Sequence, residues 1–137
     1  MTVKIYGSLP EEAAQIRTAV FCKEQGFKDE FDATDCISTH FVAFDDKTAI
    51  ATCRVFNDAI GNYHIGRIAV TKPFRGNKVG AKLLAAAQEF INGKGGKQIV
   101  ISAQVRVSKF YKKLGFLPVG EIYSDEGCPH IKMIKKL

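Results

Sequence analysis

The segment that most constrains the fold of this chain is residues 66–84, with the sequence GRIAVTKPFRGNKVGAKLL. A branched, apolar run is followed by a basic turn that contains glycine, and then by apolar residues at helical spacing. This order predicts a strand that passes directly into a helix. Because such a helix usually returns the chain to a parallel strand of the same sheet, residues 63–70 should lie beside the apolar run 98–103.

The remaining sequence predicts further strands and helices around this unit. Expected strands cover residues 2–6, 40–44, 49–56, 63–70, 98–103, 116–119 and 131–134, and expected helices cover 10–26, 79–90 and 105–114. Ser8 and Glu11 have the spacing of a capping box before the first helix. Residues 28–38 and 120–130 are expected to be irregular. No repeat, linker or composition shift divides the chain, so one mixed α/β domain over residues 1–137 is predicted.

The composition excludes several classes of protein. With 46% hydrophobic and 25% charged residues, the 137-residue chain can bury a core without staples. No apolar stretch approaches the roughly 20 residues of a membrane span, and the N-terminus shows no signal peptide. The four cysteines form no CxxC pair and are expected to be free thiols, and the three histidines form no metal motif. A cytoplasmic protein with no membrane partner and no metal is predicted.

The net charge of +6, from 20 Lys and Arg against 14 Asp and Glu, favours an anionic partner. Unpaired backbone N–H groups at the start of the helix near Val79, with Arg75 and Lys78 beside them, could bind a diphosphate. The segment fits neither the P-loop nor the dinucleotide-binding fingerprint, and on spacing alone a basic turn before a helix explains it equally well. Nucleic acid is disfavoured because the lysines are dispersed and no RNA-binding motif is present.

Two motifs resemble those of the GNAT superfamily of N-acetyltransferases. Residues 75–80, RGNKVG, resemble its motif A, Q/R-x-x-G-x-G/A, with Lys78 in place of the first Gly. Residues 110–116, FYKKLGF, resemble its FYxxxGF signature, and Gln104 stands where many members have Asn. The resemblance extends over nearly the whole chain because the order of the strands also agrees. A narrower resemblance, to the small bacterial ElaA/YjcF-type subgroup, rests on residues 17–21, 24–26, 40 and 127–133.

The resemblance implies the GNAT fold: a central, mostly antiparallel mixed sheet of six to seven strands with a splayed parallel pair, flanked by about four helices. It implies transfer of an acetyl group from acetyl-CoA to a primary amine of a small molecule or protein. Tyr111 is the implied general acid, which protonates the leaving thiolate. The implied CoA-binding residues are Ile68, Ala69, Val70, Arg75, Gly76, Asn77, Lys78, Val79, Gly80, Ala81, Gln104 and Ser108.

Four questions stay open from the sequence. The general base is not assigned, and the candidates are Glu30, Asp32, Glu121, Asp125 and His130. A non-catalytic module that binds CoA or acyl-CoA as a sensor is the alternative to an enzyme. A homodimer through the C-terminal strands is compatible with the resemblance, and the acceptor amine is not identified.

Overall fold

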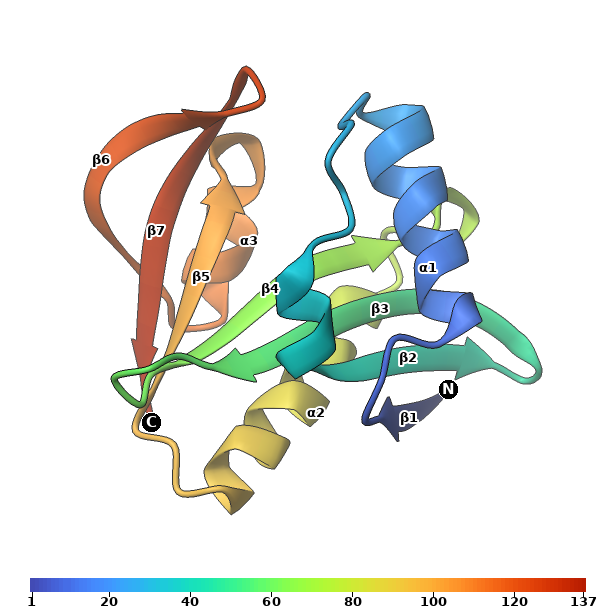
Figure 1. Ribbon diagram of the computed structural model, residues 1–137, viewed down its shortest axis with the longest axis horizontal. Helices are drawn as coiled ribbons and strands as arrows, with labels where there is room; N and C mark the ends of the chain where they lie inside the picture. The colour runs from blue at the N-terminus through green and yellow to red at the C-terminus, as the bar shows by residue number, and fades with distance from the viewer.

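The computed structural model describes residues 1–137 and is organised around one seven-stranded sheet (Figure 1). The strands follow the order β1-β2-β3-β4-β5-β7-β6, and every neighbouring pair is antiparallel except β4 and β5. This is the mixed sheet with a single parallel pair that the resemblance implies. The strand bounds are β1 Thr2–Tyr6, β2 Thr39–Asp45, β3 Thr48–Asn57, β4 Tyr63–Val70, β5 Gln98–Gln104, β6 Leu117–Asp125 and β7 Cys128–Lys136.

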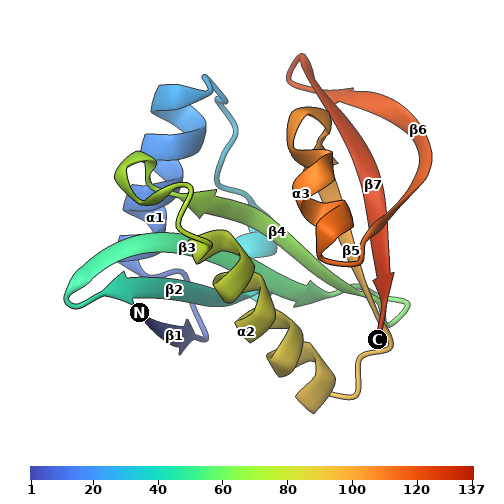
Figure 2. The same cartoon turned by 180° about the vertical axis from the view of Figure 1, so that it is seen from behind.

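Helices cover both faces of the sheet. Helix α1 lies over one face of β2 and β3, and α2 crosses the opposite face, as the two views together show (Figures 1 and 2). The three helices expected from the sequence correspond to α1 with the π-helical segment η1 that continues it, to α2 and to α3. The helical bounds are α1 Glu11–Arg17, η1 Thr18–Glu24, α2 Val79–Gly93 and α3 Ser108–Lys113, and the short 3-10 turns are η2 Ala33–Ile37, η3 Lys72–Phe74 and η4 Val105–Val107. No helix is long and apolar enough to cross a membrane.

The apolar patterns of both long helical segments predict the core correctly. Alternating residues of β2 face opposite sides of the sheet, so that Phe41 packs in the α2 layer and Val42 in the α1 layer. A fully buried Leu or Ile contributes roughly 1.5–3 kcal/mol through the surface it removes from water. The apolar residues at helical spacing that are buried are Ala13, Ile16, Val20 and Phe21 in α1 and η1, and Val79, Leu83, Leu84, Ala87 and Ile91 in α2.

Strand β4 separates from β5 along most of its length. The two strands pair only at Tyr63 with Ile99 and at His64 with Val100. Farther along, two residues of β4, Arg67 and Ile68, lie opposite one residue of β3, and Arg67 has a φ of 51°. An extra residue of this kind bends a strand. The splay at a bulge that CoA binding would require is therefore present, and it leaves an edge of β4 unpaired.

Three local predictions are wrong. The residue before α1 is Pro10, and no side chain caps the helix, so Ser8 and Glu11 form no capping box. Residues 120–130 are not irregular, because β6 and β7 continue through them to a tight turn. Their pairing with β7 and β5 supplies hydrogen bonds that local sequence preference does not reveal. Residues 28–38 contain η2 and two buried carboxylates, Glu30 and Asp35, so this segment is more than an exposed loop.

Candidate functional site

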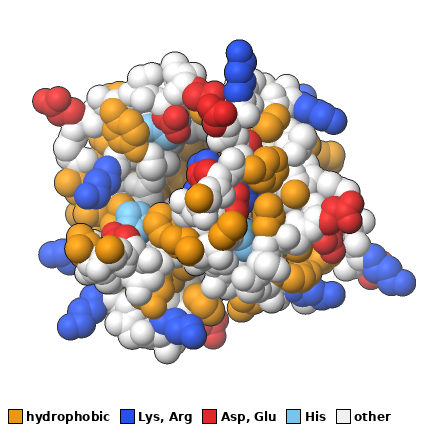
Figure 3. All heavy atoms as spheres, in the orientation of Figure 1, with side chains coloured by type: hydrophobic (Ala, Val, Ile, Leu, Met, Phe, Trp, Pro, Cys, Tyr) orange, Lys and Arg blue, Asp and Glu red, His pale blue; other side chains and the backbone are white.

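A cavity of about 1360 Å³ opens where β4 and β5 separate. Its walls come from the end of η1 and the loop after it, from β4, from the start of α2, from the β5–α3 region and from the β6–β7 turn. The space-filling view shows this face hollowed between the two halves of the molecule, with acidic side chains at the rim (Figure 3). The splayed sheet therefore creates an open site of a size that suits a large ligand.

The structure brings most of the predicted site residues to this one cavity. Of the implied CoA-binding residues, Asn77 and Ser108 do not line it. The residues that do are Ile68, Ala69, Val70, Arg75, Gly76, Lys78, Val79, Gly80, Ala81 and Gln104, together with the implied acid Tyr111. The two motifs, separated by some thirty residues of sequence, thus meet at a single surface.

The turn before α2 presents the backbone of the helix start to the cavity. Lys78 is the N-cap residue and has a left-handed backbone, with φ 60° and ψ 19°. That conformation explains why the family pattern prefers glycine here, since a side chain is strained in it. A Cβ on Gly80 would lie 3.4 Å from the Phe110 ring, so Gly80 permits α2 and α3 to pack closely. The first N–H groups of α2 have no partner within the helix and can donate hydrogen bonds to an anion.

Arg75 holds this turn in place through its side chain. Its guanidinium makes two hydrogen bonds to the Glu24 carboxylate, at 2.9 and 3.0 Å, and its Nε donates to the Val70 carbonyl at 2.9 Å. The hydrogen bond from Arg75 lowers the pKa of Glu24. The positive charge expected from Arg75 at the anion site is therefore paired, and Lys78 is the cavity-lining residue of the turn whose positive charge makes no ion pair.

Tyr111 lies at the wall of the cavity with its ring in the core. The ring makes edge-to-face contacts with Phe110 and Phe116, at centroid distances of 5.1 and 6.0 Å. Burial, and secondarily the neighbouring Cys53 thiol, raises the pKa of the Tyr111 phenol above its ordinary value. The phenol is accordingly protonated at neutral pH, as a proton donor must be.

A buried network of arginines and carboxylates lies beneath the other end of the cavity and was not predicted from the sequence. Arg17 is 1% exposed; its Nε donates to Glu30 Oε2 at 2.8 Å, and its Nη1 donates to Asp35 Oδ1 at 2.7 Å. Arg54 donates to Asp35 at 3.0 Å and to Asp32 at 2.7 Å. Burial by itself raises the pKa of Asp35, but the hydrogen bonds from Arg17 and Arg54 outweigh it and lower the pKa to about 2.

One signal in the sequence could have revealed this network. Arg17 stands four residues after Ala13 and four before Phe21, so helical phase places it on the buried face. Arg54 interrupts an apolar strand in the same way. A charged side chain at a core position needs a buried partner, and the acidic segment 28–38 is the nearest source of three carboxylates.

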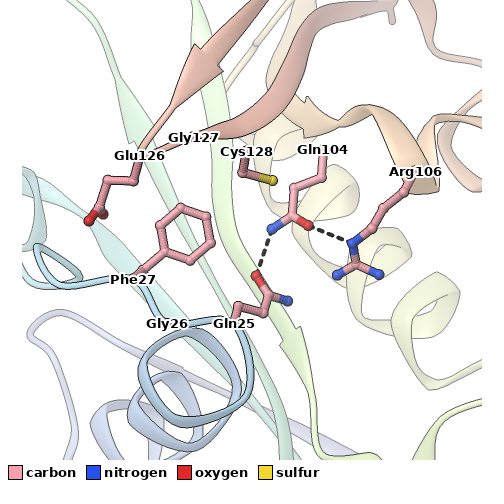
Figure 4. Close-up of a pocket in the computed structure, with 8 residues that line it drawn as sticks. All are labelled: Gln25, Gly26, Phe27, Gln104, Arg106, Glu126, Gly127 and Cys128. Atoms are coloured by element: carbon pink, nitrogen blue, oxygen red, sulfur yellow. Dashed lines mark hydrogen bonds between the residues drawn. The ribbon is translucent and has the colours of Figure 1, made fainter.

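A smaller pocket of about 290 Å³ shares five of its wall residues with the main cavity (Figure 4). Gln104 donates from its amide nitrogen to Gln25 Oε1 at 2.8 Å and accepts from Arg106 Nε at 2.9 Å. The side chain of Gln104 therefore joins the end of β5 to the end of η1, and both of its polar atoms are occupied. Its predicted role in CoA binding would need these contacts to open.

The end of the cavity away from α2 is acidic. Asp29, Asp125 and Glu126 line it without an ion pair, and Glu126 also accepts a hydrogen bond from the Lys28 backbone N–H at 3.0 Å. Of the five candidate bases, Glu121 lies outside the cavity, and the other four line it. His130 is buried and its Nδ1 is 2.8 Å from the Cys128 carbonyl. A basic chain thus places a local excess of carboxylates at this end.

Comparisons with known proteins agree with this geometry. The family described as an acetyltransferase (GNAT) domain matches residues 8–137. Protein ElaA of Escherichia coli (strain K12) is 31% identical over 129 residues, which cover 90% of this chain and 84% of ElaA.

Solved structures extend the likeness to three dimensions. A candidate N-acetyltransferase from Lactobacillus plantarum has a TM-score of 0.89 at 28% identity and covers 100% of this chain and 99% of its own. An acyl-CoA N-acyltransferase from Pseudomonas aeruginosa has a TM-score of 0.86 at 26% identity, with coverages of 98% and 99%.

Proposed function

Because the chain belongs to the GNAT family of acetyltransferases, we propose that it transfers an acetyl group from acetyl-CoA to a primary amine. The observation that carries this proposal is the shared cavity: the unpaired edge of β4, the start of α2 and Tyr111 all line it. These are the three parts that thioester binding, diphosphate binding and thiolate protonation require.

Acetyl-CoA would lie with its diphosphate at the start of α2 and its pantetheine arm along β4. The N–H groups of residues 79–81 are the donors for the diphosphate, and Lys78 adds an unpaired positive charge beside them. The arm would hydrogen-bond to the free edge of β4 at Ile68, Ala69 and Val70, as an added strand does. A backbone N–H of that edge would also stabilise the oxyanion of the tetrahedral intermediate.

The transfer itself is a direct attack. The amine nitrogen forms a bond to the thioester carbonyl carbon, and the tetrahedral intermediate collapses with cleavage of the C–S bond. Tyr111 donates its phenolic proton to the departing CoA thiolate and regains a proton when the new amide nitrogen loses its own. Its position at the cavity wall supports this role.

Ligand binding tests the first half of the proposal. Acetyl-CoA at a hundred times its Kd should add about 2.7 kcal/mol to the free energy of unfolding and raise Tm accordingly. The absence of any shift in Tm with millimolar acetyl-CoA would refute CoA binding at this site.

Turnover tests the second half. A panel of amines assayed for release of free CoA thiol should contain an acceptor, and Tyr111→Phe should lower kcat by about 100-fold with little change in Tm. Tyr6→Phe, in a partly buried tyrosine of β1 outside the cavity, is the matched control and should keep its activity. Binding of acetyl-CoA with no thiol release from any amine would instead support a sensor module.

A further inference from the structure

Glu30 is the only buried carboxylate among the candidate bases, and the fold anchors it at the cavity. Its side chain is 5% exposed, and both ion pairs that it makes fall on the same oxygen. Oε2 lies 2.8 Å from Arg17 Nε and 3.1 Å from Arg67 Nε. The main-chain carbonyl of Glu30 also accepts a hydrogen bond from each of these two arginines, at 3.0 and 3.1 Å. Four contacts from two elements therefore fix both the backbone and the carboxylate of this residue.

The second carboxylate oxygen of Glu30 faces the cavity. Oε1 accepts no hydrogen bond from the chain, because the bond from Arg17 falls on Oε2. Arg54 Nε is the only fully buried side-chain polar atom that lacks a partner, so Oε1 is not fully buried. Oε1 is therefore reached from the cavity that Glu30 lines. A nine-tenths buried carboxylate with one oxygen anchored and the other open is arranged to receive a hydrogen-bond donor.

The charges around Glu30 favour a cation as that donor. Arg17 and Arg67 contact Glu30, and these two arginines and Arg54 also pair with Asp32 or Asp35; of the three, only Arg67 lines the cavity, and its charge is taken up by Glu30 and Asp32. Asp29, Asp125 and Glu126 line the same cavity without ion pairs. The lining that faces Glu30 also includes Arg106 and His130, and Arg106 is tied to Gln104. Carboxylates outnumber the free cations on the open side, which attracts an ammonium group.

We propose that Glu30 is a catalytic residue: its Oε1 binds the ammonium group of the acceptor amine and then accepts the proton that the amine must lose. The inference rests on the proposed function. One N–H bond of the ammonium breaks, the proton moves to Glu30 Oε1, and the freed electron pair attacks the thioester carbonyl. Glu30 then returns its proton to solvent through the open cavity, so that one proton is released for each acetyl group transferred.

The protonation behaviour of Glu30 agrees with this role. Burial raises the pKa of the Glu30 carboxyl above its ordinary value, although the hydrogen bond from Arg17 and the charges of Arg67 and Arg54 oppose the shift. A raised pKa makes a carboxylate a better proton acceptor.

The decisive experiment compares the pH dependence of kcat/KM for an accepted amine in the wild type and in Glu30→Gln. Gln is isosteric, and its amide oxygen can still accept from Arg17 and Arg67. We expect a 100-fold or greater loss of kcat at neutral pH. In the variant, the acidic limb of the profile should shift to the acceptor's own pKa, since only amine already neutral in solution can react. A profile unchanged from the wild type would overturn the proposal.

A matched control separates proton transfer from loss of structure. Asp35→Asn disturbs the same Arg17 and Arg54 but lies outside the cavity, so it should lower Tm and leave the position of the acidic limb unchanged. If Asp35→Asn shifts the acidic limb of the kcat/KM profile as far as Glu30→Gln does, the shift comes from disturbing the buried arginines and carboxylates in general, and the proposal fails.

Two further readouts keep the test decisive. Glu30→Gln should retain the acetyl-CoA shift in Tm, and thiol release by the wild type shows that the proposed function stands whatever Glu30 does. If Glu30→Gln does not fold, Glu30→Asp replaces it: the shorter carboxylate keeps an acidic limb but should lower kcat at least tenfold. Full activity of Glu30→Asp would contradict a base held at a fixed position.

Discussion

Asp35 shows how strongly the tertiary structure can change the chemistry of one side chain. It accepts hydrogen bonds from two buried arginines, which lower its pKa from 3.8 to about 2. A group whose pKa is lower in the folded chain than in the unfolded chain stabilises the fold above the unfolded value. That stabilisation is lost as the pH falls towards the folded value.

Acid unfolding should therefore depend on Asp35. Between about pH 4 and pH 2 the wild type should lose roughly 2 kcal/mol of unfolding free energy through this one group. Asp35→Asn should be less stable at neutral pH, because it leaves Arg17 and Arg54 short of a charged partner, and should lose less over the same pH range. Denaturant unfolding at a series of pH values measures both effects.

The exposed turn residue Asp46 provides the control for this experiment, since Asp46→Asn should keep the wild-type acid sensitivity. Equal acid sensitivity in the wild type and in Asp35→Asn would show that the arginine pairs do not lower the pKa of Asp35 as described.

At the scale of elements, the turn between β4 and α2 combines a strained backbone with a binding role. Lys78 occupies a left-handed conformation at the N-cap of α2, where glycine would be free of strain. Because a non-glycine residue in that conformation costs roughly 1 kcal/mol, the lysine side chain is retained at the expense of stability.

Lys78→Gly and Lys78→Gln separate these two effects. Lys78→Gly should raise the free energy of unfolding by up to about 1 kcal/mol, whereas Lys78→Gln keeps the strain and should not. Both remove one exposed charge and should weaken acetyl-CoA binding by up to about fivefold. Denaturant unfolding and calorimetric titration give the two numbers. Wild-type affinity in both variants would mean that the charge of Lys78 does not contact the ligand.

At the scale of the whole molecule, the splay of one sheet into two halves is what creates the cavity. The bulge at Arg67 and Ile68 bends β4 away from β5, and the two strands pair at only two positions. Beyond His64 no strand pairs with this edge of β4, although Arg75 Nε donates to the Val70 carbonyl, and a ligand that adds along the edge would supply partners for its backbone groups.

Amide hydrogen exchange tests this arrangement directly. The amides of residues 67–70 that face β5 should exchange rapidly in the free protein and slowly when acetyl-CoA is bound. The amides of β2, paired with strands on both sides, serve as the internal reference and should exchange slowly in both states. Binding that raises Tm while leaving residues 67–70 unprotected would place the pantetheine arm elsewhere.

Much of this molecule was predictable because its signals are local. Helical spacing identified the buried faces of α1 and α2, and the strand, turn and helix of residues 63–93 follow from neighbours in sequence. The positions of Lys78, Gly80 and Tyr111 at one cavity follow from two short motifs and from the known consequence of a strand–helix–strand step.

What only the tertiary structure decided are the pairings between distant residues. Arg17 meets Glu30 and Asp35 across 13 and 18 positions of sequence, and Arg75 meets Glu24 across 51. Local periodicity carries no information on which carboxylate a buried arginine contacts, because that choice depends on how the loop folds over the sheet. The sequence by itself determined the family, the helical core and part of the cavity wall; the folded chain decided which charges are paired, because those pairs join residues that are distant in sequence.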